Sequence, residues 1–220
     1  ERREVNTRNL NSSNTFFVGI SEIPLLPDFS KGTYNQIVDL PDNVTIQDFT
    51  AGMIGEKEDD LFYIGRYNEK RLNMYTGDHF EKNNRCIHMG IDIGAPVGTK
   101  VNSFTAGEIF LFGYNEKALD YGYTIITKHI IDDCIVFALY GHLNRESITE
   151  KKNGEPVFRG QALGEIGNED ENGGWPPHVH FQLSLIAPKT YDLPGVVSEK
   201  DWGLAQKIFP DPRLVQGQLY

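Results

Sequence analysis

Two histidines that are separated by a single residue, His178 and His180, stand in the run "WPPHVHFQLSLI" (175–186). Apolar residues alternate with polar ones through this run, which predicts a half-buried β-strand. The apolar members are Val179, Phe181, Leu183 and Leu185. On such a strand both histidines point to the same side, the polar face of a sheet, away from the core. Neighbouring imidazoles repel each other when protonated, so a partner is expected, most often a metal ion.

A second segment, "CIHMGIDIGAPVGT" (86–99), carries His88 and Asp92 on one face of an alternating run. Residues i and i+4 of a straight strand lie about 13 Å apart, at ~3.3 Å per residue, which is too far to bind one ion. We therefore expect a bend or bulge at Gly90 or at the "GAP" turn that follows. Two histidines and one carboxylate leave a coordination position open, which marks a catalytic rather than a structural zinc site.

The third segment is "VFALYGHL", in which His142 follows Gly141 at the end of an apolar strand and Tyr140 shares the parity of His142. A single histidine in such a place is more often structural than functional. We interpret His79 and His129 as structural or surface residues.

The motifs "HMGID", "YGHL" and "HVHFQL" together resemble the LytM/lysostaphin-type zinc metallopeptidases, endopeptidases that mostly cleave bacterial cell-wall peptides. The flanking text "GAPVGTKVNSFTAGEI" and "NGGWPPHVHF" also matches, and the resemblance covers residues 84–186. It implies a sandwich-like antiparallel β domain of the duplicated-hybrid-motif type, in which the first motif curves around a zinc ion in a groove.

The resemblance also implies a role for each motif residue. His88, Asp92 and His180 would bind one Zn²⁺ per chain. His142 and His178 would act as the catalytic pair that moves protons and stabilises the tetrahedral intermediate, and Tyr140 would contact the substrate. The expected function is that of a zinc-dependent metalloendopeptidase, a hydrolase acting on peptide bonds of peptidoglycan.

Short strands punctuated by Gly, Pro, Asn and Asp follow one another from about residue 84, which predicts a mainly β fold, an antiparallel sandwich or barrel-like domain. We divide the chain into an N-terminal extension or small β-subdomain (1–80), the zinc peptidase-like β domain (81–190) and a C-terminal tail (191–220). Ser198 is the expected N-cap of a short helix in that tail. The expected core opposite the site consists of Ile87, Ile91, Ile93, Val179, Phe181, Leu183 and Leu185.

The composition of the chain limits the kinds of binding partner to be expected. The 220-residue chain has a formal net charge of −10, which disfavours nucleic acid and anionic membranes. No run approaches the ~18 apolar residues of a transmembrane helix. Cys86 and Cys134 are too few for a disulfide framework, and one bridge or two free thiols both remain open. The oligomeric state is open.

The first residues include neither Met nor an apolar leader, so the expected location is extracellular or periplasmic if a leader was removed, and cytoplasmic if the chain belongs to a larger intracellular protein.

Other functions remain open at this point. A non-catalytic member could keep the groove to bind a peptide. A phosphocarrier also uses two nearby histidines on a sheet but does not need Asp92. An Fe(II) oxygenase uses two histidines and a carboxylate, usually as HxD, whereas this chain has HxxxD. The segment "YDLPGVVSEKDWGLAQKIFPDPRLV" further resembles the tail of such peptidase modules when they are joined to class III aminotransferases in long intracellular chains, which implies that the substrate need not be peptidoglycan.

Overall fold

The structure is a computed structural model that describes residues 3–5, 15–50, 62–72, 74–75 and 84–220. His79 and parts of the expected N-terminal extension lie outside these residues. The strands are β1 (Arg3–Val5), β2 (Glu22–Pro24), β3 (Thr45–Ile46), β4 (Tyr63–Gly65), β5 (Arg85–His88), β6 (Ile91–Gly94), β7 (Lys100–Asn102), β8 (Gly107–Asn115), β9 (Gly122–Ile131), β10 (Cys134–Leu143), β11 (Pro156–Val157), β12 (Ala162–Glu165), β13 (His178–Ser184) and β14 (Val196–Ser198). The helices are the 3-10 turns η2 (Thr15–Phe17) and η3 (Phe29–Lys31), and α2 (Glu146–Thr149), α3 (Glu199–Ile208) and α4 (Arg213–Gln216).

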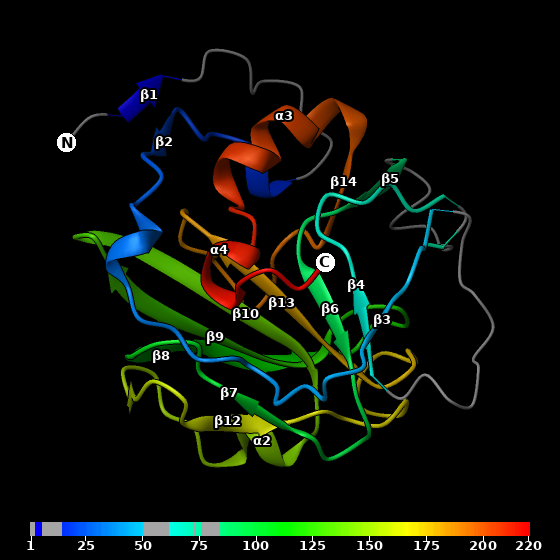
Figure 1. The fold of residues 1–220 in the computed structure, drawn as a ribbon. Coiled ribbons are helices and arrows are strands. Elements are labelled where there is room, and N and C mark those ends of the chain that lie inside the picture. Colours follow the sequence, from blue (N-terminus) through cyan, green and yellow to red (C-terminus); the bar gives the residue numbers. More distant parts are fainter. Residues whose placement is uncertain (1–2, 6–14, 51–61, 73, 76–83) are drawn as a thin grey trace.

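One 8-stranded sheet, in the order β11-β8-β9-β10-β13-β6-β4-β3, forms the centre of the molecule (Figure 1). Neighbouring strands within this sheet pair antiparallel, except for the parallel pair β3–β4 at one edge. The prediction of a mainly β, antiparallel fold is therefore confirmed, with one parallel pair that makes the sheet mixed. The edge strands β3 and β4 come from the expected N-terminal extension, and β4 pairs with β6.

Apolar side chains are buried on both faces of this sheet, so the fold has two packed layers. On one face they pack against β7, β12, α4 and the segment around η3. On the other they pack against β5, β14, α3 and η2. In Figure 1, α3 lies at the top of the view and the β7–β12 pair at the bottom, with the large sheet between them. Six of the seven expected core residues lie in the first layer: Ile91, Ile93, Val179, Phe181, Leu183 and Leu185.

The seventh expected core residue, Ile87, requires a correction. Ile87 and Met89 pack in the second layer, with α3 and β14, while Ile91 and Ile93 pack in the first. The expectation assumed one continuous strand with a single apolar face. In the structure the chain leaves β5 after His88 and begins β6 at Ile91, so its two halves present their apolar residues to opposite layers.

Helix α3 begins where the sequence predicts. The Ser198 side chain accepts a hydrogen bond from the backbone N–H of Asp201, which confirms Ser198 as the N-cap. Glu199 and Asp201 lie in the first turn, where carboxylates interact favourably with the helix dipole. Pro210 follows the end of the helix.

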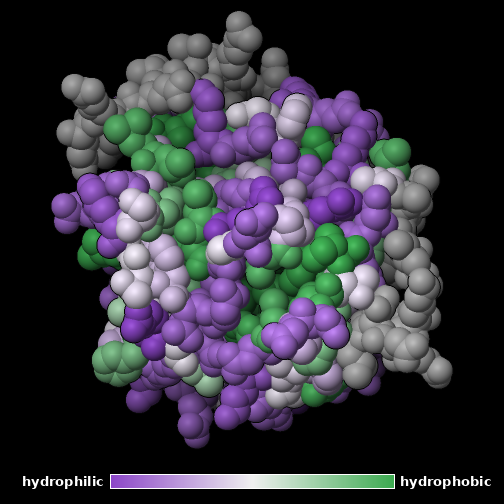
Figure 2. Space-filling model, in the orientation of Figure 1, coloured by the Kyte–Doolittle hydropathy of each residue, from purple (hydrophilic) through white to green (hydrophobic). Residues whose placement is uncertain are grey.

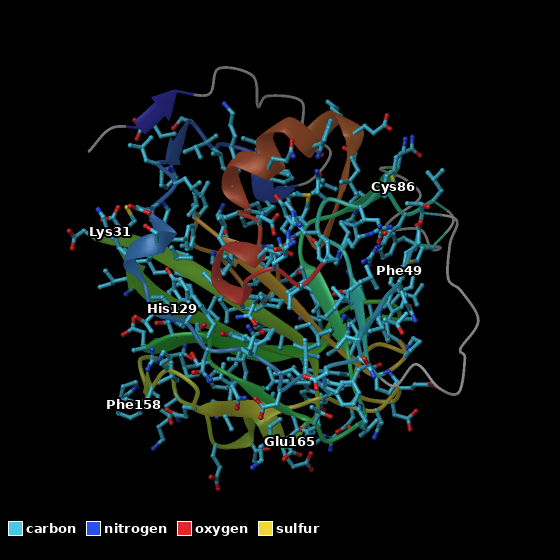
Figure 3. All side chains as sticks on the ribbon, viewed as in Figure 1. Lys31, Phe49, Cys86, His129, Phe158 and Glu165 are labelled. Atoms are coloured by element: carbon cyan, nitrogen blue, oxygen red, sulfur yellow. The ribbon has the colours of Figure 1, made fainter. Side chains whose placement is uncertain are left out.

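The face in Figure 2 is mostly hydrophilic, with hydrophobic residues showing between the polar ones. Within the described ranges, no helix has the length and apolar character needed to span a bilayer. Cys86 and Cys134 are free thiols. Cys86, in β5, is labelled at the right of Figure 3, and His129, in β9, at the left.

Candidate metal centre and active site

The bend that the sequence required lies at Gly90, between β5 and β6. A Cβ atom at this position would lie 2.6 Å from ring atoms of His180 and 2.7 Å from the carbonyl oxygen of Phe181. Because no side chain fits there, the two backbones approach closely and the chain turns. The bend brings His88 Nε2 to 3.2 Å from Asp92 Oδ1. The predicted bend is confirmed, and it removes the 13 Å separation of a straight strand.

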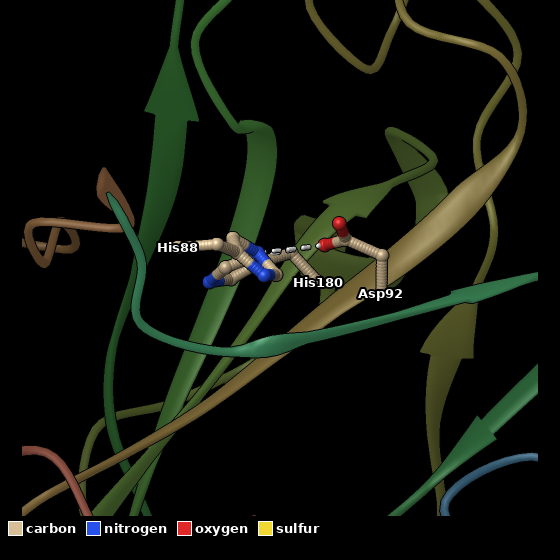
Figure 4. A group of neighbouring side chains, drawn as sticks. All are labelled: His88, Asp92 and His180. Atoms are coloured by element: carbon tan, nitrogen blue, oxygen red, sulfur yellow. Dashed lines mark hydrogen bonds and ion pairs between the residues drawn. The ribbon is translucent and has the colours of Figure 1, made fainter. Parts of the chain in front are cut away.

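Strand β13 supplies the third side chain of the cluster. His180 is directly paired with Asp92 in the β13–β6 ladder, so their side chains leave the same face of the sheet. His180 Nδ1 lies 2.9 Å from Asp92 Oδ1 and 3.0 Å from His88 Nε2. The three side chains point toward one another from three directions (Figure 4). They are buried and are so placed that they could hold one metal ion.

The separations of these three atoms fit a metal ion. Ligands about 2.0–2.1 Å from a tetrahedral zinc ion lie about 3.3 Å from one another. The observed separations of 2.9, 3.0 and 3.2 Å are slightly shorter. A small outward movement of the side chains would place an ion among them.

The partners of the outward-facing ring nitrogens explain why a cation is needed. His88 Nδ1 lies 2.9 Å from the Arg66 carbonyl oxygen, to which it must donate. The Gln182 amide donates to the Pro194 carbonyl at 3.3 Å, so Gln182 Oε1 faces His180 Nε2 at 3.0 Å and accepts a hydrogen bond from its N–H. The two inward nitrogens are then unprotonated and face a carboxylate oxygen. Three acceptors in contact are favourable only around a cation.

Burial sets the same protonation states. Burial, together with the nearby Arg71 charge, lowers the pKa of His88 to about 4. Burial alone would raise the pKa of Asp92, but the neighbouring His88 ring and the Arg71 guanidinium hold that pKa well below its usual range. Neutral imidazole and ionised carboxylate are the forms that bind metals.

A bulge in β10 turns His142 toward this cluster. Tyr140 pairs with Phe181 and Gly141 pairs with His180, so Gly141 is on the face of the metal cluster. The register against β9 shifts between Tyr140 and Leu143, and His142 has a φ of 65°, in the left-handed region. The extra residue of a bulge lets two successive residues face the same side. The His142 ring therefore lies 4.3 Å from the His178 ring, centroid to centroid.

The rings of His142 and His178 lie beside the metal cluster, 4.3 Å from each other. His142 Nδ1 donates to the Asn172 carbonyl at 2.7 Å, and His178 Nδ1 donates to the Pro176 carbonyl at 2.7 Å. His178 Nε2 lies 3.8 Å from Asp92 Oδ1. Burial lowers the pKa of both rings, and His178 and His180 lower that of His142 further. Two neutral imidazoles thus lie beside the three ligand atoms, each able to take up a proton.

Tyr140 is not part of this site, contrary to the expectation that it contacts substrate. Its side chain is fully buried in the first layer, and its hydroxyl accepts a 3.3 Å hydrogen bond from the Phe104 backbone N–H. The expectation assigned Tyr140 and His142 to one face by their parity. The bulge between them cancels that parity, so only His142 reaches the site.

The polar face of β13 is covered, not open to solvent as predicted. His178 and His180 expose 7% and 3% of their surfaces, and Gln182 and Ser184 are fully buried. The second layer lies over this face, and the Tyr121 ring packs 5.1 Å from that of His180. The alternation of apolar and polar residues correctly predicted that β13 has two chemically different faces. It could not show that a second layer covers the polar one.

Sequence reasoning missed several residues of the site. Arg71 contacts Asp92, Tyr121 packs between His142 and His180, and Gln182 orients His180. Of these three residues, only Gln182 could have been recognised from the sequence, because it shares the parity of His180 along the strand. His129, interpreted as structural, is buried apart from the cluster and bonds to Thr127 Oγ1 and the Ala106 carbonyl.

The fold and the site together define a metallopeptidase-like β domain. Comparison with known proteins agrees: residues 86–191 match the sequence model of Peptidase family M23. The matched segment contains the three ligand candidates and both further histidines.

Two curated relatives share this segment. The chain is 30% identical over 141 residues to the peptidoglycan DD-endopeptidase ShyC of Vibrio cholerae, covering 60% of this chain and 28% of that protein. It is 38% identical over 82 residues to an uncharacterized protein of Haemophilus influenzae, covering 37% of this chain and 18% of that one. The chain thus spans less than a third of the length of either relative.

Solved structures overlap with parts of the fold. A catalytic-domain mutant of the prophage-encoded M23 protein EnpA from Enterococcus faecalis is 26% identical, with a TM-score of 0.41, over 64% of this chain and 92% of that one. The catalytic domain of lysostaphin from Staphylococcus simulans is 22% identical, with a TM-score of 0.43, over 66% of this chain and 92% of that one. Both scores are below 0.5, so the likeness to Peptidase family M23 rests on the sequence match and not on these structures.

Proposed function

We propose that this chain is a zinc-dependent metalloendopeptidase that hydrolyses peptide bonds in peptidoglycan. The observation that carries the proposal is the cluster of His88 Nε2, Asp92 Oδ1 and His180 Nδ1, three acceptor atoms in mutual contact. We assign one Zn²⁺ per chain to these atoms. When bound, zinc supplies a Lewis acid that polarises a carbonyl group and lowers the pKa of water towards ~7.

His142 and His178 are the proposed acid–base pair. Both rings are neutral, and each has its Nδ1 bonded to a carbonyl, while no hydrogen bond among the described residues occupies Nε2. One ring can accept the proton of the attacking water, and a protonated ring can donate to the oxygen of the tetrahedral intermediate or to the leaving amine. No glutamate among the described residues belongs to the ligand cluster, so we assign proton transfer to these histidines.

Peptidoglycan is the proposed substrate because the relative from Vibrio cholerae is named a peptidoglycan DD-endopeptidase. Such a substrate would require the site to work on the wall side of the cytoplasmic membrane, and we propose that location. A peptide from another source is the alternative, as is binding without cleavage. Both are outcomes of the test that follows.

The test is mass spectrometry of purified peptidoglycan after digestion, with and without a chelator. We expect new amino-terminal ends in cross-linked peptides, absent with the chelator and restored by added zinc. Asp92→Ala is the inactive variant, and His129→Gln is the matched control, since His129 is a buried histidine outside the cluster. Binding of peptidoglycan with no new ends in any zinc-loaded sample would favour a groove-binding module and contradict the proposal. Elemental analysis that finds iron would contradict the zinc assignment.

A further inference from the structure

We propose that Arg71 is a positioning residue of the metal centre, which occupies Oδ2 of Asp92 so that only Oδ1 is free to bind the ion. The inference rests on the proposed function, because it needs a metal at the cluster. Its consequence is a carboxylate that coordinates through one oxygen and leaves a coordination position open for chemistry. Arg71 lies before residues 86–191, outside the segment that matches the family.

The contact with Asp92 is direct and buried. Arg71 Nη1 donates to Asp92 Oδ2 at 2.7 Å, while Oδ1 of the same carboxylate faces His88 and His180. The side chains of Arg71 and Asp92 expose 1% and 7% of their surfaces. A buried charge-assisted hydrogen bond of this length restrains rotation of the carboxylate. Rotation is the movement that would bring Oδ2 to the ion as a second ligand atom.

Glu69 and Phe49 fix the guanidinium in turn. Arg71 Nε donates to Glu69 Oε2 at 2.9 Å, and Glu69 is itself buried, with a side chain that is 3% exposed. The guanidinium lies over the Phe49 ring, 4.8 Å from its centroid. Arg71 thus lies between two buried carboxylates. Glu69 fixes the position of Arg71, and Arg71 fixes the position of Asp92.

The backbone keeps this segment beside the ligand strand. The backbone N–H of Arg71 donates to the Cys86 carbonyl at 2.7 Å, and the N–H of His88 donates to the Glu69 carbonyl at 3.0 Å. Residues 69–71 therefore pair with β5, which carries the first ligand. Placement of Arg71 and placement of His88 depend on the same hydrogen bonds.

Gly65 provides the space for the ion pair. It pairs with Asp92 in the β4–β6 ladder, and a Cβ atom on it would lie 2.7 Å from Arg71 Nη2 and 3.0 Å from Asp92 Oδ2. A side chain at this position would push the two partners apart. The requirement for glycine here comes from packing against the pair.

The test is metal affinity and cobalt spectroscopy, which are independent of activity. The dissociation constants of Zn²⁺ and Co²⁺ are measured by competition with a chromogenic chelator for the full chain and for Arg71→Met, Arg71→Lys and Arg66→Met. Removal of an outer partner of a metal ligand weakens binding about 10–100-fold, and we expect this for Arg71→Met. Its Co²⁺ complex should also absorb less strongly in the visible range, because a second carboxylate oxygen raises the coordination number. Arg71→Lys, which keeps one charged donor, should restore part of the affinity.

Arg66→Met is the matched control. Arg66 donates to the same Glu69 at 2.7 Å, but no contact joins its side chain to Asp92 among the described residues. The Arg66 group that contacts the ligand His88 is the backbone carbonyl, which the substitution leaves in place. Its variant should bind metal within about 3-fold of the unaltered chain. Thermal unfolding with a chelator gives the stability of each metal-free variant, so a purely structural role of Arg71 is recognised as lower stability with unchanged affinity and spectrum.

The possible results separate the two proposals. If the unaltered chain binds neither metal, the proposed metal centre is wrong. If it binds metal and Arg71→Met has the same dissociation constants and spectrum, or if Arg66→Met loses as much affinity, only the positioning role is overturned. If Arg71→Met does not fold, Arg71→Lys decides: binding weaker than that of Arg66→Met supports the role, and equal binding overturns it.

Discussion

The two histidines of β13 differ in what their inward nitrogens face. His180 presents Nδ1 to His88 and Asp92, while His178 presents Nε2 at the edge of the cluster, 3.8 Å from Asp92 Oδ1. The difference arises because the outward nitrogen of His180 donates to a side chain two residues along the strand, and that of His178 donates to the backbone of Pro176. Residues of one type on one face can thus have different roles.

The alanine variants of these histidines should therefore fail differently. We expect His180→Ala to lose both zinc and activity, because one of three ligands is gone. We expect His178→Ala and His142→Ala to keep zinc and lose activity by roughly 10²-fold or more, the usual effect of removing an acid–base or oxyanion partner. Zinc content and peptide hydrolysis are measured on folded protein. Metal-free His178→Ala would mean that both histidines of the strand are ligands.

Removal of the carboxylate should affect both metal and stability. Asp92→Ala should lose most of the zinc and should also leave Arg71 buried with Glu69 as its remaining carboxylate partner. Breaking a buried ion pair typically costs about 3–5 kcal/mol. Chelator competition reports the metal, and urea unfolding of the metal-free forms reports the stability. A variant that keeps one zinc per chain against a mild chelator would contradict the ligand assignment.

Two elements place these side chains by departing from regular geometry. The bend at Gly90 brings His88 to Asp92, and the bulge in β10 turns His142 to the site. Both depart from the simple alternation of a strand. Helix α3 is regular in comparison, and its placement depends on its cap and on Ala205 and Ile208, which are buried in the second layer.

The cap of α3 allows a test at the level of one element. Ser198 Oγ accepts from the Asp201 N–H at 3.3 Å and donates to the Asp201 carboxylate at 3.0 Å. Ser198→Ala should lower the free energy of unfolding by about 1 kcal/mol, as for other N-caps. Ser198→Thr, which keeps a hydroxyl, should lose less. Equal urea midpoints for the alanine variant and the unaltered chain would show that the cap does not contribute.

The molecule as a whole buries titratable groups between its layers, which makes stability depend on pH. Burial lowers the pKa of His129 to about 4, and that of His88 to about 4 without metal. In the unfolded chain a histidine has a pKa near 6.5. Between pH 4 and 6.5 the unfolded state therefore binds more protons than the folded state. Stability is full above this window and falls as the pH decreases through it.

His129 isolates this effect from the metal centre. In chelator, the free energy of unfolding of the unaltered chain should fall between pH 7.5 and pH 5, and His129 should account for about 2 kcal/mol of that decrease. His129→Gln should lack this part of the decrease, whatever its own stability at pH 7.5. Urea titrations at the two pH values measure it. The same pH dependence in both proteins would mean that His129 does not stay neutral in the folded state.

The sequence by itself determined the strands, the motif residues and the helix cap, because these depend on local patterns. Alternation predicted the β13 strand and six of seven core residues correctly, and glycine marked the bend between His88 and Asp92. The resemblance to the zinc peptidases, carried by three short motifs, is borne out by the match of residues 86–191 to Peptidase family M23.

Only the tertiary structure decided which faces are covered and which distant residues meet. Parity along β10 predicted that Tyr140 and His142 share a face, but a bulge formed against β9 separates them. Alternation could not reveal the second layer over His178 and His180, since that layer comes from residues far along the chain. Nor could it reveal that Arg71 contacts Asp92, because 21 residues separate them and strand pairing joins them. Local patterns fix the direction of a side chain along its own strand, whereas its neighbours are fixed by strand register and packing.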